Sequence, residues 1–143
     1  MSITVERTPD GRRICVSREI PVSRGRAWDV LTDTDRWPAW GPSVRAVESS
    51  ERYIQQGTTG RVKTPVGLWV PFEITGCADY RWTWRVARIP ATGHRVDSVE
   101  REHSENEACR VVFEIPLLAG GYVPVCRRAL ERIESLVTGS ASK

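Results

Sequence analysis

The stretch 121–139 constrains this chain most, because its apolar residues recur at spacings of three and four. That spacing places them on one face of an α-helix. Pro124 is tolerated in a first helical turn, where its missing N–H removes no hydrogen bond, and Gly139 suits a helix end. The rest of the chain must cover the apolar face, which consists of Tyr122, Cys126, Ala129, Leu130, Ile133, Leu136 and Val137.

The composition is that of one ordinary globular domain, with 143 residues, 40% of them hydrophobic and 27% charged. We expect a single domain over 1–143, with a core over about 13–138 and short tails at both ends. The net charge of +3 comes from scattered basic and acidic side chains. Nucleic-acid binding is therefore not expected, since it would cluster lysine and arginine on one face.

No stretch has the length of a signal-peptide core or of the roughly 20 apolar residues of a membrane span. We therefore expect a cytoplasmic protein whose four cysteines are reduced. Because none forms a CxxC pair, we interpret Cys15, Cys77, Cys109 and Cys126 as small buried hydrophobic residues. Neither a metal site nor a cofactor is predicted, and the sequence leaves a homodimer open.

Upstream of the predicted helix the dominant pattern is alternation of side chains, which is typical of strands. Turn residues separate the alternating segments, and short turns make neighbouring strands antiparallel. We place turns at 90–93 and 104–107. The predicted strands cover 3–6, which is an edge strand, then 13–20, 44–54, 58–64, 68–76, 80–88, 94–103 and 108–115.

Two short helices are predicted between the strands 13–20 and 44–54. Ser23 can cap the first, which runs to Leu31. The second contains Trp37 and must be brief, because Pro38 and Pro42 lie on either side of Trp40. The order predicts an α+β domain in which a twisted antiparallel sheet curls around the long carboxy-terminal helix.

This order, together with the string AWDVLTDTDRWPAWGPSV at 27–44, resembles the START-like (SRPBCC) superfamily. The tetrapeptide Trp37-Pro38-Ala39-Trp40 matches its turn into the second strand, and the polyketide cyclase/dehydrase and lipid-transport branch is most similar. The resemblance extends over about 13–137. It implies a helix-grip fold, with about six or seven antiparallel strands around the long helix and two short helices after the first strand.

The resemblance also implies a cavity between sheet and helix. Members of the superfamily bind lipids, sterols, polyketides, plant hormones or quinones, and some are cyclases, dehydratases or hydroxylase subunits. Fold alone does not decide among these activities.

Aromatic residues are the strongest indication of a binding site. Large flat side chains suit planar apolar ligands, and tyrosine adds a hydroxyl group. The alternative is that the rings only fill the core, and we expect Trp37 and Trp40 to fix their turn. The predicted ligand-binding residues are Phe72, Tyr80, Trp82, Trp84, His94, Val96, Tyr122 and Cys126.

The candidates for a general base are His94 and Tyr80. His94 and His103 lie an odd number of residues apart on one predicted strand, so they face opposite sides of the sheet. His94 has the parity of the inward residue Val96, which makes it the better candidate.

Arg18 and Glu100 have the parity of inward apolar residues, so either could anchor a polar ligand group. No catalytic triad, phosphate-binding loop or convincing carboxylate pair is present in the sequence. We therefore predict binding of a hydrophobic small molecule without a cofactor, with Gly120 and Gly121 as a hinge at the cavity entrance. The alternatives are a cofactor-free polyketide cyclase or dehydratase, and an interaction module with a vestigial cavity.

Overall fold

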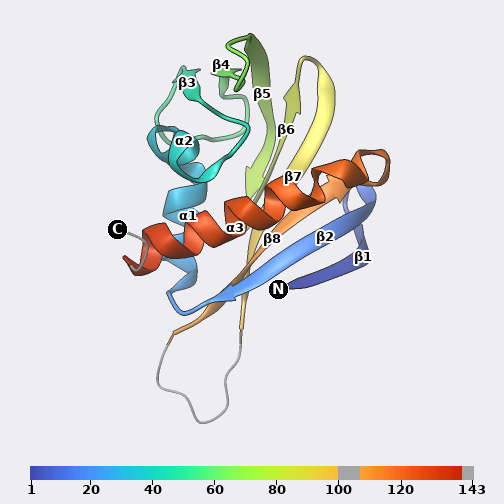
Figure 1. Cartoon of the computed structure of the whole chain (residues 1–143), viewed down its shortest axis with the longest axis vertical. Helices are drawn as coiled ribbons and strands as arrows, with labels where there is room; N and C mark the ends of the chain where they lie inside the picture. Colours follow the sequence, from blue (N-terminus) through green and yellow to red (C-terminus); the bar gives the residue numbers. More distant parts are fainter. Residues whose placement is uncertain (100–106, 140–143) are drawn as a thin grey trace.

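The computed structural model describes residues 1–99 and 107–139. In this part of the chain one antiparallel sheet of eight strands, in the order β1-β2-β8-β7-β6-β5-β4-β3, curves around a long helix (Figure 1). The predicted fold class is confirmed. The strands are β1 (Ser2–Thr8), β2 (Gly11–Ile20), β3 (Ala46–Ser49), β4 (Thr59–Lys63), β5 (Trp69–Ala78), β6 (Arg81–Val86), β7 (Ile89–Ser98) and β8 (Cys109–Pro116).

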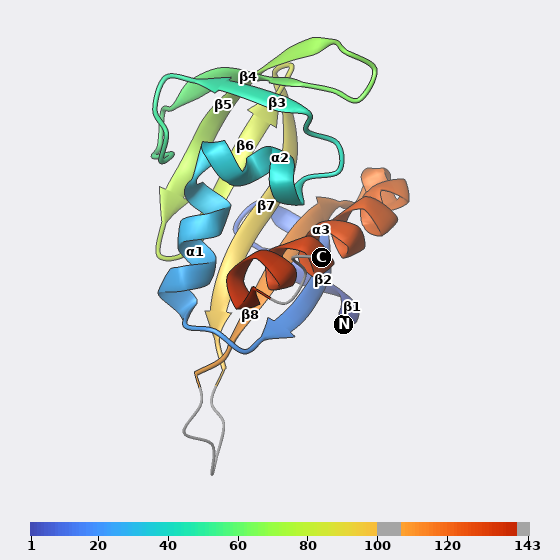
Figure 2. The ribbon, with the colours of Figure 1, turned by 60° about the vertical axis from the view of Figure 1, so that its left-hand side comes forward.

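Three α-helices, α1 (Arg24–Thr32), α2 (Trp37–Trp40) and α3 (Val123–Thr138), lie on one side of the sheet (Figure 2). The 3₁₀ turns η1 (Thr34–Arg36) and η2 (Leu117–Tyr122) precede α2 and α3. The α3 helix has Pro124 in its first turn and ends at Gly139, whose φ of 70° is left-handed. Five residues of the predicted stripe are buried, namely Cys126, Ala129, Leu130, Ile133 and Val137. Leu136 is half-buried, and Tyr122 precedes the helix and is exposed.

The side chains that meet the helices come from one face of each central strand. On β8 these are Val111, Phe113 and Ile115, all at most 2% exposed. Phe72 and Ile74 of β5 are buried in the same core. The parity predicted for these strands is therefore observed.

The short helices are tied to each other through two indole groups. Trp37 Nε1 donates to the carbonyl of Leu31 at 2.9 Å, and Trp40 Nε1 donates to that of Val30 at 3.2 Å. Both acceptors lie in the last turn of α1, where carbonyls have no partner within the helix. The two tryptophans thus fix the turn, as the sequence predicts.

The turn predicted at 90–93 is wrong, because β7 already begins at Ile89. The chain reverses instead at Ala87 and Arg88, whose φ angles of 54° and 67° are those of a two-residue hairpin turn. Asp79 and Tyr80, with φ of 54° and 62°, make the same kind of turn between β5 and β6. The turn was predicted at 90–93 because Pro90 and Gly93 are typical turn residues.

The predicted strand 44–54 is also too long, since β3 ends at Ser49. Beyond it the chain bonds to the end of α1: Ile54 N–H donates to Thr32 O at 3.1 Å, and Thr34 N–H donates to Arg52 O at 2.8 Å. At the amino terminus, by contrast, β1 pairs with β2 from Ser2 to Thr8. His103, Glu100 and residues 104–106 of the predicted hairpin lie outside the described residues.

The opposite face of the sheet holds a buried ion cluster that the sequence analysis missed. Glu114 of β8 is 1% exposed and accepts hydrogen bonds from Arg81 Nη2 and Arg95 Nη1, each at 2.7 Å. Burial alone would raise the pKa of Glu114, but the bonds from Arg81 and Arg95 outweigh it and hold the pKa below its ordinary value. Gly93 provides the space, because a Cβ there would lie 2.7 Å from Glu114 Oε1.

Gly60 of β4 gives a stability test of the sheet packing. A Cβ there would lie 2.2 Å from the Glu48 carbonyl oxygen and 2.8 Å from the Phe72 ring. We expect Gly60→Ala to lower the free energy of unfolding by about 2 kcal/mol or more. Gly25 of α1 has no atom within 4 Å of such a Cβ, so Gly25→Ala should raise it by about 0.5 kcal/mol. Urea unfolding of both variants measures the contrast, and equal effects would contradict the packing described.

Candidate functional site

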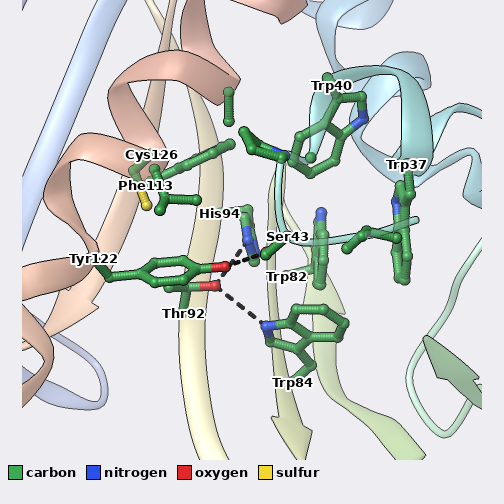
Figure 3. Close-up of a pocket in the computed structure, with 15 residues that line it drawn as sticks. Trp37, Trp40, Ser43, Trp82, Trp84, Thr92, His94, Phe113, Tyr122 and Cys126 are labelled. Carbon is green, nitrogen blue, oxygen red and sulfur yellow. Dashed lines mark hydrogen bonds between the residues drawn. The ribbon is translucent and has the colours of Figure 1, made fainter. Parts of the chain in front are cut away.

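A stack of three aromatic rings occupies the space between α2 and the sheet (Figure 3). Trp82 of β6 lies between Trp37 of α2, at 5.3 Å and 8°, and His94 of β7, at 3.9 Å and 19°. Trp84 stands edge-on to all three rings, at 72–80° and 5.4–6.0 Å between centroids. Such offset and edge contacts add to the stabilisation from burial.

A hydrogen-bonded chain fixes the imidazole of His94. Trp84 Nε1 donates to Thr92 Oγ1 at 3.2 Å, and Thr92 Oγ1 lies 3.0 Å from His94 Nε2. A hydroxyl that accepts from Trp84 still has its own proton to donate, so we assign that proton to the bond with Nε2. The ring proton then sits on Nδ1, which has no hydrogen-bond partner of normal geometry.

Burial lowers the pKa of His94 to about 3, and the backbone of Trp82 and the charge of Glu114 oppose this only in part. The imidazole is therefore neutral near pH 7. A base with so low a pKa is poorly matched to proton abstraction at neutral pH. The low pKa, the stacking on Trp82 and the bond of Nε2 to Thr92 together favour a structural role for the ring.

Tyr122 and Ser43 form a hydrogen bond across the mouth of the interior (Figure 3). Tyr122 ends η2, just before α3, and Ser43 lies in the loop between α2 and β3. Burial raises the pKa of Tyr122, and the bond with Ser43 offsets part of that rise. The phenol is therefore protonated near pH 7 and can donate a hydrogen bond.

Two spaces meet at this bond. The inner one is a cavity of about 40 Å³ beside the ring stack, large enough for a few water molecules. The outer one is an open groove of about 370 Å³, at the lower end of the range for ligand pockets. Both are lined by Ser43, Val44, Trp84, Thr92 and Tyr122.

The groove wall is mostly apolar. Valines from three adjacent strands form its floor, and η2 closes one side. Apart from the shared residues, its lining consists of Val62, Thr64, Val70, Val86, Pro90, Ala91, Pro116 and Ala119.

Five of the predicted ligand-binding residues line the inner cavity, namely Trp82, Trp84, His94, Tyr122 and Cys126. Burial raises the pKa of Cys126 to about 12, so its thiol stays protonated. Phe72 packs against Trp37 and Trp84 behind the cavity wall. Val96 is fully buried in the core and lines neither space.

Tyr80 lies away from the other candidates, because its left-handed turn conformation breaks the alternation that was extended to it. Its ring packs on Trp28 at 5.6 Å, and the guanidinium of Arg24 lies 4.0 Å above it. These residues border a separate open hollow with Cys77 and Ala78. Tyr80 and His94 are therefore not brought together at one site.

Arg18 is not an anchor inside the cavity. It forms an ion pair with Glu134 of α3, and both side chains are about one-third exposed. Its parity on β2 is inward, between the buried residues Val16 and Ile20, but Glu134 of α3 supplies the carboxylate that pairs with its guanidinium.

Ser43, Thr92 and the groove valines were not predicted as site residues from the sequence. Val62, Val70 and Val86 have the inward parity of their strands, so the alternation could have found them. Thr92 was assigned to a turn, which hid its inward position on β7. Nothing in the local sequence around Ser43 indicates its bond to Tyr122, which is 79 residues away.

Residues 1–99 and 107–139 contain no group of three or more His, Cys, Asp or Glu side chains placed to hold a metal ion. The four cysteines are free thiols, three of them buried. No helix in the described part of the chain is long and apolar enough to cross a membrane.

No protein-family model and no curated protein matches this chain. Solved structures do match its fold. Protein XoxI from Bacillus cereus aligns with a TM-score of 0.64 at 13% identity, over 87% of this chain and 94% of that one. The conserved protein of unknown function EF2215 from Enterococcus faecalis also reaches 0.64, at 16% identity, over 98% of this chain and 80% of that one.

Ara h 8.0201 aligns with a TM-score of 0.60 at 13% identity, over 88% of this chain and 98% of that one. Likenesses at such low identity show the fold alone. The chain has a Bet v 1-like helix-grip fold, in agreement with the START-like architecture that the sequence resembles.

The buried neutral His94 predicts a specific pH dependence of stability. In the unfolded chain His94 takes up a proton below its ordinary pKa of 6.5, whereas in the folded chain it does so only near pH 3. The free energy of unfolding should therefore fall by about 1.4 kcal/mol per pH unit over that window from this group alone. In His94→Gln the fall between about pH 6 and pH 4 should be shallower by about 1 kcal/mol per unit. Urea unfolding measures both slopes, and equal slopes would contradict the assignment.

Proposed function

We propose that this protein binds a small, largely apolar molecule in the groove between η2 and strands β4–β7. The observation that carries the proposal is the groove itself, about 370 Å³ in volume and floored by valines, with one polar pair at its inner end. Pockets of this kind, apolar with a few placed polar groups, are typical of ligand sites.

The enclosed interior does not support a larger ligand. The stack of Trp37, Trp82 and His94 fills the space between α2 and the sheet and leaves about 40 Å³. We therefore place the ligand outside the stack, against Trp84, with its inner end at the bond between Ser43 and Tyr122.

Ligand binding in the groove involves no proton transfer by His94 or Tyr80. His94 is neutral, with a pKa of about 3, and its Nε2 is engaged by Thr92. Tyr80, the other candidate base, lies in a different hollow. These positions favour binding over a cyclase or dehydratase reaction at His94 and Tyr80.

The polar pair indicates what chemistry the ligand carries. A ligand hydroxyl or carbonyl at the inner end of the groove can accept from Tyr122 or Ser43 and replace part of their mutual bond. Trp84 and Val86 present flat and branched apolar surfaces beside it. We infer a planar ligand with one oxygen-bearing end.

Filling the groove tests the site. Ala91 lines the groove and Ala78 lines the separate hollow beside Tyr80. We expect the fluorescent probe 1-aminoanthracene to bind the unchanged protein, and Ala91→Trp to weaken binding by about tenfold or more, because the indole occupies the ligand space. Ala78→Trp should leave the affinity unchanged. Fluorescence titration gives all three dissociation constants.

If Ala78→Trp abolished binding and Ala91→Trp did not, the hollow beside Tyr80 would be the site. Absence of binding by the unchanged protein to a series of such planar probes would refute the groove proposal.

Paired ligands test the role of the polar end. We expect 2-naphthol to bind more tightly than 2-methylnaphthalene, by about fivefold for one net hydrogen bond. Tyr122→Phe combined with Ser43→Ala should reduce this ratio to near one, because both hydroxyl groups are removed. Displacement of 1-aminoanthracene measures both ligands, and a ratio that survives the double substitution would exclude this polar pair.

A further inference from the structure

Aliphatic side chains stand exposed around the mouth of the groove. Val66 is 82% exposed, Ile89 66% and Leu118 104%. Two more, Leu68 and Leu117, are exposed beside them. We call Val66, Leu68, Ile89, Leu117 and Leu118 the apolar rim.

The rim is gathered from three loops that border the groove. Val66 and Leu68 lie in the turn between β4 and β5, Ile89 follows the turn between β6 and β7, and the two leucines begin η2. Both hairpin turns lie at the same end of the sheet (Figure 1). Each rim segment lies within two residues of a groove residue in sequence, namely Thr64, Pro90 or Ala119.

The charge around the rim is of one sign. The loops 64–68, 87–89 and 116–122 contain Arg88 and no aspartate or glutamate. Lys63 ends the strand that leads into the first loop, and Arg45 Nη1 donates to the Pro65 carbonyl at 3.3 Å. At the other end of the sheet the turn between β5 and β6 carries Asp79 instead.

Most backbone donors of the turn that carries Val66 are paired. Thr64 N–H donates to Leu68 O at 2.8 Å, Gly67 N–H to Thr64 O at 2.9 Å, and Leu68 N–H to Thr64 Oγ1 at 3.2 Å. A turn with few unpaired N–H groups loses little when it leaves water. Trp69 follows directly, and tryptophan is favoured where an apolar region meets a wet one.

We propose that the apolar rim docks on an anionic lipid bilayer. The aliphatic side chains enter the acyl boundary, while Lys63, Arg45 and Arg88 meet the lipid phosphates. Isolated apolar tips on separate turns, surrounded by basic residues, suit a fluid anionic surface better than a flat protein face. In this orientation the groove opens toward the membrane, from which an apolar ligand would enter.

Docking is a property separate from ligand binding. The rim residues do not line the groove, so their substitution leaves the ligand site intact. Vesicle binding can also be measured without any ligand, so failure of one proposal does not decide the other.

The experiment is co-sedimentation of the protein with vesicles of phosphatidylcholine, alone or with about a quarter phosphatidylglycerol. We expect binding to the anionic vesicles that weakens at high salt. Lys63→Gln with Arg88→Gln should weaken it by about 25-fold, from about fivefold per charge. Val66→Ser with Leu118→Ser should weaken it by about tenfold or more.

The matched control is Ile3→Ser with Arg26→Gln, since both residues are exposed and lie on β1 and α1, away from the rim. It should bind vesicles like the unchanged protein, and circular dichroism with 1-aminoanthracene titration checks that each variant is folded. No binding to anionic vesicles, or equal loss in control and rim variants, would overturn the proposal. The proposal would also be overturned if the protein did not bind vesicles but formed a dimer that Leu118→Ser disrupts. A second copy of the chain would then cover the rim.

Discussion

The stack of Trp37, Trp82 and His94 is the contact on which the rest of the structure depends. It joins α2 to the hairpin of β6 and β7, although β3, β4 and β5 separate α2 from that hairpin in the chain. Because the rings lie in van der Waals contact, a charge on His94 would be buried without a partner, and the ring stays neutral. The same contact fills the space between sheet and helix, and this moves the usable ligand space outward to the groove.

The two faces of β7 show how one strand serves two different interiors. His94 points into the aromatic stack, while Gly93 and Arg95, on either side of it, meet Glu114 on the opposite face. One interior is held by ring contacts and the other by charge-assisted hydrogen bonds. Removing one partner of the ion cluster around Glu114 would leave an uncompensated buried charge. Substitutions on either face of β7 are therefore expected to be destabilising.

The sequence predicted the fold well because helix and strand periodicities are local signals. The face of α3 and the inward residues of β5, β6 and β8 all followed from spacing. Tyr80 was misplaced because Asp79 and Tyr80 adopt a left-handed turn without a glycine, which is the usual sequence signal for such a turn. The bond between Ser43 and Tyr122 and the burial of Glu114 depend on residues far apart in the chain, which periodicity does not report.

The wall of the interior at α2 is held by the indole hydrogen bonds of Trp37 and Trp40, and it is held more firmly than the wall at η2. Any outward movement of α2 would break these bonds and leave the carbonyls of Leu31 and Val30 unpaired. The opposite wall, at η2, is joined to the α2–β3 loop by the single bond between Tyr122 and Ser43, and Gly120 and Gly121 precede it. We therefore expect ligands that differ in width to be accommodated by movement of η2 rather than of α2.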